Sequence, residues 1–301
     1  MSDEEARATF QRIRWADNAG EPYCPQCGCL TAYKLATRPV WKCGGCNHQF
    51  SVTSGTIFSD RKRPLRDYLL AIAIFANGAK GHSALQLSRD LNCQYKTAFV
   101  LAHKLREAID AAQQQTTFSD TSEKEVDGAY FGGAIKPANE AAKRVDRRLA
   151  EEQTGKRQVV AVIRERNGKT LPFVVAKESD AIPTIRARVP MGSTVHADEA
   201  RGWDALHAHY EMRRINHSIS YSKDGACTNQ AESYFSRLRR AELGTHHKIS
   251  GRYLGAYASE MAWREDNRRT SNGEQFNAIA GLAIRFPVSQ KWARYWQRSA
   301  A

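Results

Sequence analysis

Three acidic residues in the second half of the chain have a spacing that could hold metal ions. Asp127 lies in EVDGAYFGG and Asp198 in STVHADE, and each ends or interrupts a short apolar run that predicts a strand. Glu232 follows thirty-four positions after Asp198, at the start of an amphipathic helix. Three converging carboxylates can bind two Mg²⁺ ions, which can activate water or a 3′-hydroxyl for attack on phosphorus. These residues therefore predict phosphodiester chemistry.

In the predicted site Asp127 bridges two Mg²⁺ ions, for which Mn²⁺ could substitute, while Asp198 binds one ion and Glu232 the other. Each acid also has a structural alternative: Asp127 as a turn residue before a glycine, Asp198 as a helix cap, and Glu232 as part of a capping box begun by Asn229. Three nearby acids remain rival ligands: Glu125, Glu199 and Asp224.

The elements around these acids predict a mixed sheet. A strand over 126–131 is followed by RQVVAVIRE and TLPFVVAKE, joined through Asn167-Gly168, a strong hairpin signal. Ser179 could cap a helix over 181–189, and strands in STVHADE and RRINHSISY flank a short helix in RGWDAL. The order β-β-β-α-β-α-β-α is that of an RNase H-like α/β core. The charged segment between the first strand and the hairpin is expected to be a mobile loop.

A pair of CxxC motifs near the N-terminus predicts a zinc ribbon. CPQC and CGGC supply Cys24, Cys27, Cys43 and Cys46, and fifteen residues separate the two motifs. This spacing suits one structural Zn²⁺ ion held by four thiolates. A redox CxxC is the alternative, but such motifs occur singly and near a βαβ pattern, which is missing here.

Between these regions the sequence turns helical. Apolar periodicity runs from Leu65 to Ile109, Ser83 is a candidate N-cap, and a break at Asn92-Cys93 suggests a helix-turn-helix. The second helix of that motif enters the major groove. It would bring Gln94, Tyr95, Lys96 and Thr97 to DNA, with His103, Lys104 and Arg106 further along. A plain helical hairpin fits the same pattern.

The helix that begins near Glu232 has a basic face. Tyr234 or Phe235, Leu238, Ala241 and Leu243 have core spacing. Three arginines, Arg237, Arg239 and Arg240, are left facing solvent, where they could bind phosphates or simply be solvated.

Composition favours a partner that is a polyanion. Lys and Arg outnumber Asp and Glu by 45 to 32, for a net charge of +13, although charge alone does not separate DNA from RNA. No apolar run approaches the roughly 18 residues of a membrane span. The acidic start is unlike a signal peptide and the remaining cysteines are scattered, so we expect a cytoplasmic protein.

Taken in order, these motifs resemble the bacterial ISXO-like insertion-sequence transposases, over most of residues 20–270. The resemblance rests on a succession of segments: YCPQCG, WKCGGCNHQFSVTSGTIF, SALQLSRDLNCQYKTAFVLAHKLREAI, VDGAYFGG, VHADEARGWDAL, INHSISYSKDG and NQAESYFSRLRRAELGTHHKIS. It implies that the ribbon and helices recognise terminal inverted repeats, and that an RNase H-like DDE core cuts and joins DNA with Mg²⁺.

The family's first two acids correspond to Asp127 and Asp198, and its variable third position to Glu232. A family lysine is replaced by Arg239, which changes the geometry of phosphate contact. The resemblance also suggests that Trp263 and Arg264 lie near DNA.

We therefore predict a multidomain α+β DNA transposase that acts on double-stranded DNA and self-associates there, near the nucleoid and without a membrane. The predicted parts are an N-terminal helical segment (1–20), a zinc ribbon (21–58), a helix-turn-helix-like region (59–114), the catalytic domain (120–262) and a basic C-terminal tail (263–301). The alternatives are a DNA-binding regulator with an inactive core and an RNase H-like nuclease without strand transfer.

Overall fold

The computed structural model describes residues 1–131, 138–145, 157–216 and 227–298. It divides into two compact units, one of residues 1–109 with 270–301 and one of residues 110–269. The five-part division drawn from the sequence is finer than this one and stays a prediction.

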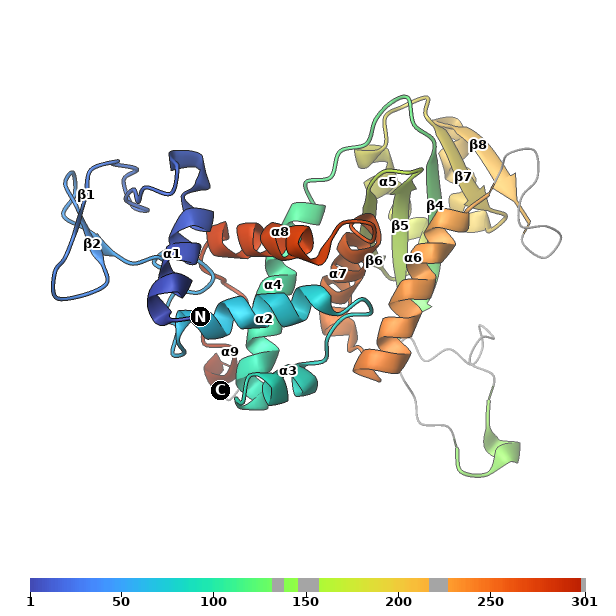
Figure 1. Cartoon of the computed structure of the whole chain (residues 1–301). Helices are drawn as coiled ribbons and strands as arrows, with labels where there is room; N and C mark the ends of the chain where they lie inside the picture. Colours follow the sequence, from blue (N-terminus) through green and yellow to red (C-terminus); the bar gives the residue numbers. More distant parts are fainter. Residues whose placement is uncertain (132–137, 146–156, 217–226, 299–301) are drawn as a thin grey trace. The chain divides into compact units, whose positions relative to one another are not determined.

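The second unit is built on a five-stranded mixed sheet of order β6-β5-β4-β7-β8 (Figure 1). The strands are β4 (Lys124–Phe131), β5 (Gln158–Glu165), β6 (Thr170–Val175), β7 (Thr194–Asp198) and β8 (Glu211–Ile215). Strands β4, β5 and β6 pair antiparallel, and β7 pairs parallel with both β4 and β8. Along the chain the elements follow the predicted order β-β-β-α-β-α-β-α of an RNase H-like core.

Each face of this sheet is covered by helices because its strand residues alternate in direction. On one face, here called the α6 face, Ala129, Phe131, Val160 and Val162 pack against α6 (Asn229–Arg240) and α7 (Leu254–Asp266). On the other face Val126, Ala161 and Ile163 belong to a core with α5 (Ile182–Arg188) and the 3₁₀ helix η5 (Arg201–Ala208). Figure 1 shows the strands between these two layers.

The local predictions for this unit hold in part. The hairpin at Asn167-Gly168 forms, with Asn167 at φ 58°. The helix expected from residue 181 begins at Ile182, after the 3₁₀ turn η4 (Glu178–Ala181). Asp180, rather than Ser179, closes this turn by accepting a hydrogen bond from the Lys177 N–H at 3.0 Å. Most of the segment predicted as a mobile loop lies outside the described residues, apart from the short 3₁₀ helix η2 (Ala141–Lys143).

The first unit contains a small three-stranded sheet. Its strands are β1 (Ala32–Lys34), β2 (Trp41–Cys43) and β3 (Gln49–Phe50). The buried indole of Trp15 meets the rings of Trp41 and Phe50 edge-on, at centroid distances of 5.5 and 6.2 Å. Aromatic packing thus supplies the core that so short a module otherwise lacks.

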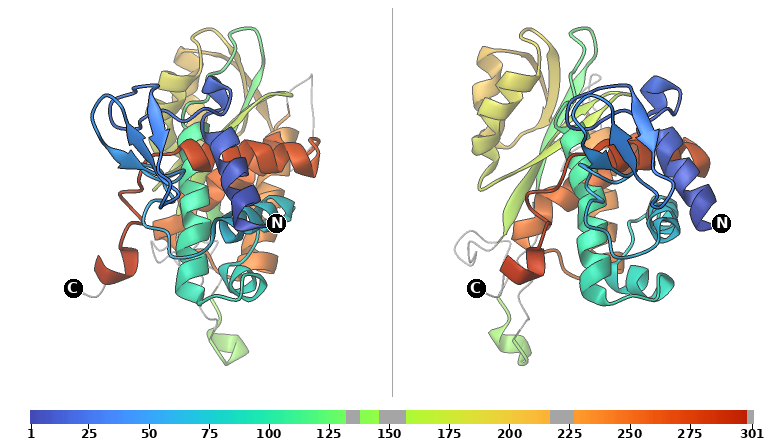
Figure 2. Two further views of the ribbon diagram at one scale, coloured as in Figure 1. Left: turned by 60° about the vertical axis from the view of Figure 1, so that its left-hand side comes forward. Right: turned by 90° about the vertical axis from the view of Figure 1, so that its left-hand side faces the viewer.

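Helices complete the first unit. Helix α1 (Asp3–Arg14) packs against α2 (Leu65–Asn77) and α8 (Asn272–Arg285), as the blue and red helices in Figure 2 show. Helices α3 (Ala84–Asp90) and α4 (Tyr95–Gln113) follow α2, and Ser83 caps α3 as predicted, through the Gln86 N–H. Residues 91–94 join them, which is the connection of a helix-turn-helix-like pair.

Two predictions of DNA proximity are wrong because tertiary packing buries the side chains. His103 and Arg106 on α4 have no exposed surface. Trp263 and Arg264 lie on α7, which continues to Asp266, and the Arg264 guanidinium pairs with Glu260 at 2.9 Å. No helix in the described part of the chain is long and apolar enough to cross a membrane.

The contact between α6 and the sheet can be tested through Phe235. Its ring is 1% exposed and lies 6.0 Å from Phe131 and 5.2 Å from Tyr234, centroid to centroid. Phe235→Ala should lower the free energy of unfolding by about 3–5 kcal/mol, measured by urea denaturation. Leu243 is 74% exposed, so Leu243→Ala should change it by about 0.5 kcal/mol or less. Equal effects would show that α6 does not pack on this face.

Candidate active site

Strand pairing places Asp127 and Asp198 side by side on the α6 face. In the parallel pair β4 and β7, Val126 is opposite Ala197, so the next residue of each strand is an aspartate in the same phase of the pleat. Asp127 shares the direction of Ala129 and Phe131, whose side chains meet α6. Both carboxylates therefore lie at the carboxyl end of the parallel pair, on the side from which α6 approaches.

Glu232 reaches this region from the first turn of α6. Thr228 is the N-cap, and its carbonyl accepts a hydrogen bond from the Glu232 N–H at 2.9 Å. Ala231, Tyr234 and Phe235 are buried against the sheet. The alternative role of Glu232 in a capping box with Asn229 is not seen, because Asn229 is already the first helical residue.

The three predicted acids are close enough to interact electrostatically. The pKa of Asp127 is raised to about 7, chiefly by burial of the carboxyl group, and the negative charges of Asp198, Glu178 and Glu232 raise it further. A hydrogen bond from the Gly128 N–H at 2.7 Å opposes these effects. A divalent cation would relieve this repulsion, so the carboxylate set fits Mg²⁺ or Mn²⁺.

The acids are nevertheless not gathered as tightly as ligands of one ion. In the described ranges, the four N-terminal cysteines are the group of potential ligands whose donor atoms all lie within 4.8 Å of one another. A spread-out arrangement is compatible with two ions, which lie roughly 4 Å apart in two-metal sites.

Glu178 is a fourth acid of this region that sequence reasoning missed. It follows β6, and its side chain lies against two glycines: a Cβ on Gly128 would be 2.8 Å from its Cγ, and one on Gly202 would be 3.0 Å from its Cβ. Burial raises the pKa of Glu178, and Asp198 adds to the effect. The one sequence feature that could have indicated this close approach is Gly128, but a glycine after an aspartate is equally typical of a turn.

Two of the three rival ligands have other hydrogen-bond partners. Glu125 is buried and hydrogen-bonded to the start of α6. Glu199 is exposed and accepts a hydrogen bond from Asn216 at 2.6 Å. Asp224 lies outside the described residues. Asp127, Asp198 and Glu232 stay the predicted ligands, while the Glu125 carboxylate is hydrogen-bonded to the start of α6.

The four cysteines form a second candidate metal site. Cys24 Sγ lies 3.7 Å from Cys46 Sγ, and Cys27 Sγ lies 3.6 Å from Cys43 Sγ. A tetrahedron with Zn–S bonds of about 2.3 Å has edges of about 3.8 Å, so the sulfur atoms fit Zn²⁺. Hydrogen bonds from the Cys46 and Gly45 N–H groups help to lower the pKa of Cys43 to about 6, and so favour the thiolate that binds metal.

The residues proposed to meet DNA on α4 differ in exposure. Gln94, Tyr95, Lys96 and Thr97 are exposed at the start of the helix. Lys104 is partly buried, its ammonium donates to the Ile57 carbonyl at 2.6 Å, and burial lowers its pKa. Its charge is therefore directed at the protein.

The three arginines of α6 also differ. Arg239 and Arg240 are exposed, and the Arg239 guanidinium lies 5.9 Å from the ring centroids of Phe131 and Phe235. Arg237 is only partly exposed and pairs with the buried Glu265 on α7 at 2.8 Å. Only the first two match the predicted solvent-facing surface.

Comparison with known proteins agrees with this architecture. Residues 121–266 match the model of the ISXO2-like transposase domain, and residues 1–49 match that of the transposase zinc-ribbon domain. The chain therefore carries an ISXO2-like transposase domain together with a transposase zinc ribbon. The transposase domain thus contains the five-stranded sheet with α6 and α7, and the zinc-ribbon match contains the four cysteines.

A curated relative of this transposase spans nearly its whole length. An uncharacterized protein in transposable element ISH50 of Halobacterium salinarum is 23% identical over 297 residues, covering 94% of this chain and 98% of the relative. A chain in the crystal structure of the Mos1 strand transfer complex is 11% identical, over 75% of this chain and 76% of that chain, with a TM-score of 0.25. At that score the likeness carries no argument.

The zinc site predicts a stoichiometry. The purified protein should hold one equivalent of zinc, and Cys43→Ser should lose it because three thiolates bind the ion far more weakly. Metal analysis after dialysis measures this. Cys93→Ser is the matched control, since Cys93 lies outside the cluster, and should keep the zinc. Full zinc content in Cys43→Ser would contradict the four-thiolate site.

The raised pKa of Asp127 predicts a pH-dependent stability. With a folded pKa near 7 against an ordinary value of 3.8, its contribution is fully present below pH 4 and is lost as the pH rises through 7. In buffer without Mg²⁺, Asp127→Asn should therefore melt on the order of several degrees above wild type at pH 8. The difference should shrink as the pH falls to 4. A difference independent of pH would show that Asp127 ionises normally.

Proposed function

We propose that this transposase binds the terminal inverted repeats of its insertion sequence and catalyses Mg²⁺-dependent cleavage and transfer of DNA strands. The observation that carries the proposal is the in-phase pairing of β4 and β7, which puts Asp127 beside Asp198 on the face that α6 covers. The effect of Glu232 on the Asp127 pKa supports its place as the third acid.

Each acid has a distinct role in this proposal. Asp127, whose pKa is raised by the charges of both Asp198 and Glu232, would be a ligand of both Mg²⁺ ions, while Asp198 would hold one ion and Glu232 the other. When bound, the ions activate the attacking oxygen and stabilise the leaving 3′-oxygen. The strand backbone holds the aspartates, so the protein contributes fixed positions rather than a general base.

The DNA is proposed to contact two exposed surfaces. Gln94, Tyr95, Lys96 and Thr97 lie at the start of α4, where a helix-turn-helix reads base edges. Arg239 and Arg240 lie on the helix that carries Glu232, where they can bind phosphates. Arg237 and Lys104 are left out of these surfaces, because their charges are already directed at protein groups. Two element ends must be brought together, so self-association on DNA is part of the proposal.

Two alternatives make different predictions. A DNA-binding regulator with an inactive core would bind the repeat and leave it uncut. An RNase H-like nuclease would cut DNA and release the 3′ end. The assembled acids favour an active core over the first alternative, and the match to a transposase domain favours strand transfer over the second.

A strand-transfer assay tests the proposal. The full-length protein is incubated with Mg²⁺ and a labelled duplex carrying the element's terminal repeat. Asp127→Asn, Asp198→Asn and Glu232→Gln should each lower the yield of joined product by about 100-fold or more, since losing a metal ligand removes several kcal/mol of transition-state stabilisation. Glu199→Gln, which changes an exposed neighbouring acid, should stay active.

The outcomes distinguish the transposase from the regulator and the nuclease. Binding without nicking supports the regulator, and nicking without joining supports the nuclease. An active Glu232→Gln variant would remove Glu232 from the site and make Glu178 the next acid to test.

A further inference from the structure

A buried carboxylate links the strand of Asp127 to the helix of Glu232. Glu125 lies on β4 two residues before Asp127 and has no exposed surface. Its Oε2 accepts hydrogen bonds from the N–H groups of Gln230 and Ala231 at 2.8 and 2.9 Å. These N–H groups belong to the first turn of α6, where backbone donors have no partner within the helix. A carboxylate there is favoured by charge as well as by hydrogen bonding.

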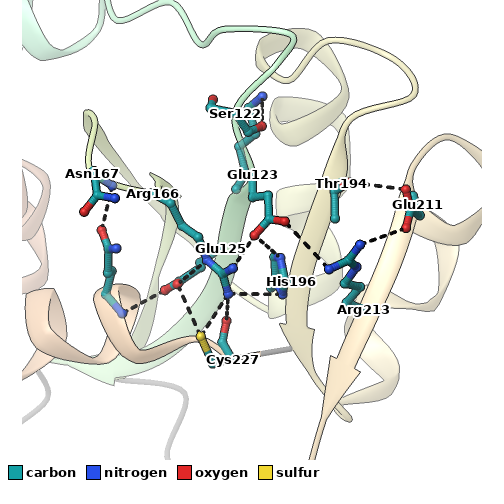
Figure 3. A network of polar contacts seen from close by, with 12 residues as sticks. Ser122, Glu123, Glu125, Arg166, Asn167, Thr194, His196, Glu211, Arg213 and Cys227 are labelled. Atoms are coloured by element: carbon teal, nitrogen blue, oxygen red, sulfur yellow. Dashed lines mark hydrogen bonds and ion pairs between the residues drawn. The ribbon is translucent and has the colours of Figure 1, made fainter. Parts of the chain in front are cut away.

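The second oxygen of this carboxylate is hydrogen-bonded to an arginine. Arg166 follows β5, and its Nε donates to Glu125 Oε1 at 3.1 Å. Its Nη2 donates to the carbonyl oxygen of Cys227 at 3.2 Å and contacts the sulfur at 2.9 Å. Cys227 comes just before α6, so the guanidinium holds both the carboxylate and the segment that leads into the helix (Figure 3).

Buried His196 and partly exposed Glu123 join Glu125 and Arg166 in a polar layer. His196 Nε2 lies 3.1 Å from Glu123 Oε2, and its Nδ1 lies 3.3 Å from Arg166 Nη2. An arginine only donates, so Nδ1 accepts, the ring proton is on Nε2, and His196 is neutral. Burial, followed by the charge of Arg166, lowers the pKa of His196, in agreement with the neutral form.

Two residues of this layer lie on the same strands as the aspartates. Glu125 and His196 are opposite each other in the parallel pair β4 and β7, and each precedes its aspartate by two residues. Residues two apart in a strand share a face and are about 6.6 Å apart. Glu125 therefore points to the α6 face as Asp127 does, while its hydrogen bonds end on the residue next to Glu232.

We propose that Glu125 is a positioning residue that sets the distance between Glu232 and the two aspartates. Both of its oxygen atoms are committed to protein donors, so it acts through the placement of α6 rather than as a metal ligand. This rests on the proposed function, because the role has meaning only if Glu232 holds a metal ion.

The test compares metal affinity with stability in the full-length, zinc-loaded protein. Glu125→Asp keeps the buried charge beside Arg166 but withdraws it by one methylene, so the protein should stay folded while α6 loses its anchor. Binding of Mn²⁺, followed by electron paramagnetic resonance, should weaken by about 10- to 100-fold, as for other residues that orient metal ligands. Glu125→Gln, which brings an amide N–H₂ against donors, should weaken it further.

Asp266→Asn is the matched control. Asp266 is also buried, pairs with Arg164 at 2.6 Å and accepts from the Thr170 N–H at 3.2 Å. It ends α7 rather than beginning α6. Its loss should lower the melting temperature but leave Mn²⁺ affinity unchanged, so a general loss of stability is separated from a positioning role.

A double variant tests whether Glu125 affects metal binding through Glu232. If Glu125 acts through Glu232, Glu125→Asp combined with Glu232→Gln should bind Mn²⁺ no more weakly than Glu232→Gln alone. Wild-type affinity in Glu125→Asp, or full additivity in the double variant, would overturn the positioning role. If wild type binds Mn²⁺ no better than Asp127→Asn, the proposed function falls and the positioning role with it.

Discussion

The candidate active site depends on one constraint, the in-phase parallel pairing of β4 with β7. With Val126 opposite Ala197, the pleat turns Asp127 and Asp198 to the same face. A slip of one residue in this register would send one aspartate to the opposite core. The apolar residues resist such a slip, because Val126 and Ala197 fill the α5 side while Ala129 and Phe131 fill the α6 side. Hydrophobic alternation thus fixes where the two charges lie.

The polar layer of Glu123, Glu125, Arg166 and His196 lies next to the acids, and Glu125 and His196 each come two residues before an aspartate on β4 and β7. Two carboxylates, Glu123 and Glu125, meet Arg166, while His196 is held neutral between Glu123 and Arg166. Partial burial acts to raise the pKa of Glu123, but Arg166 and His196 together hold it below its usual value. The layer is thus locally paired, whereas the acids in front of it raise the pKa of Asp127. A divalent cation bound at these acids would lower their mutual repulsion.

The features that could be predicted from the sequence are those that depend on the spacing of residues close together in the chain. The cysteine motifs predicted the ribbon, and hydrophobic periodicity with turn residues predicted the hairpin and the order of strands and helices along the chain. The buried face of α6 was also predictable: Tyr234, Phe235, Leu238 and Ala241 are buried, and only Leu243, 74% exposed, departs from the expected core.

The features that the sequence did not predict are contacts between residues far apart in the chain. Lys104 was predicted to meet DNA, but its ammonium reaches the carbonyl of Ile57, and no helical period indicates that partner. Glu125 was considered as a rival metal ligand. In the structure its carboxylate instead accepts hydrogen bonds from the N–H groups of Gln230 and Ala231, more than a hundred positions later in the chain. Glu178 was missed because its proximity to Asp198 arises from the turn after β6. Such pairs are set by tertiary packing, which propensity and periodicity do not encode.

The most direct test of the central claim is to map the metal site by cleavage of the protein itself. Fe²⁺ replaces Mg²⁺ in the full-length protein, and ascorbate with peroxide generates hydroxyl radicals that cut the backbone near the bound ion. The account predicts cuts around residues 127, 198 and 232 that are suppressed by excess Mg²⁺ and lost in Asp127→Asn. Cuts elsewhere, or cuts at these residues that persist in the variant, would contradict the shared metal site.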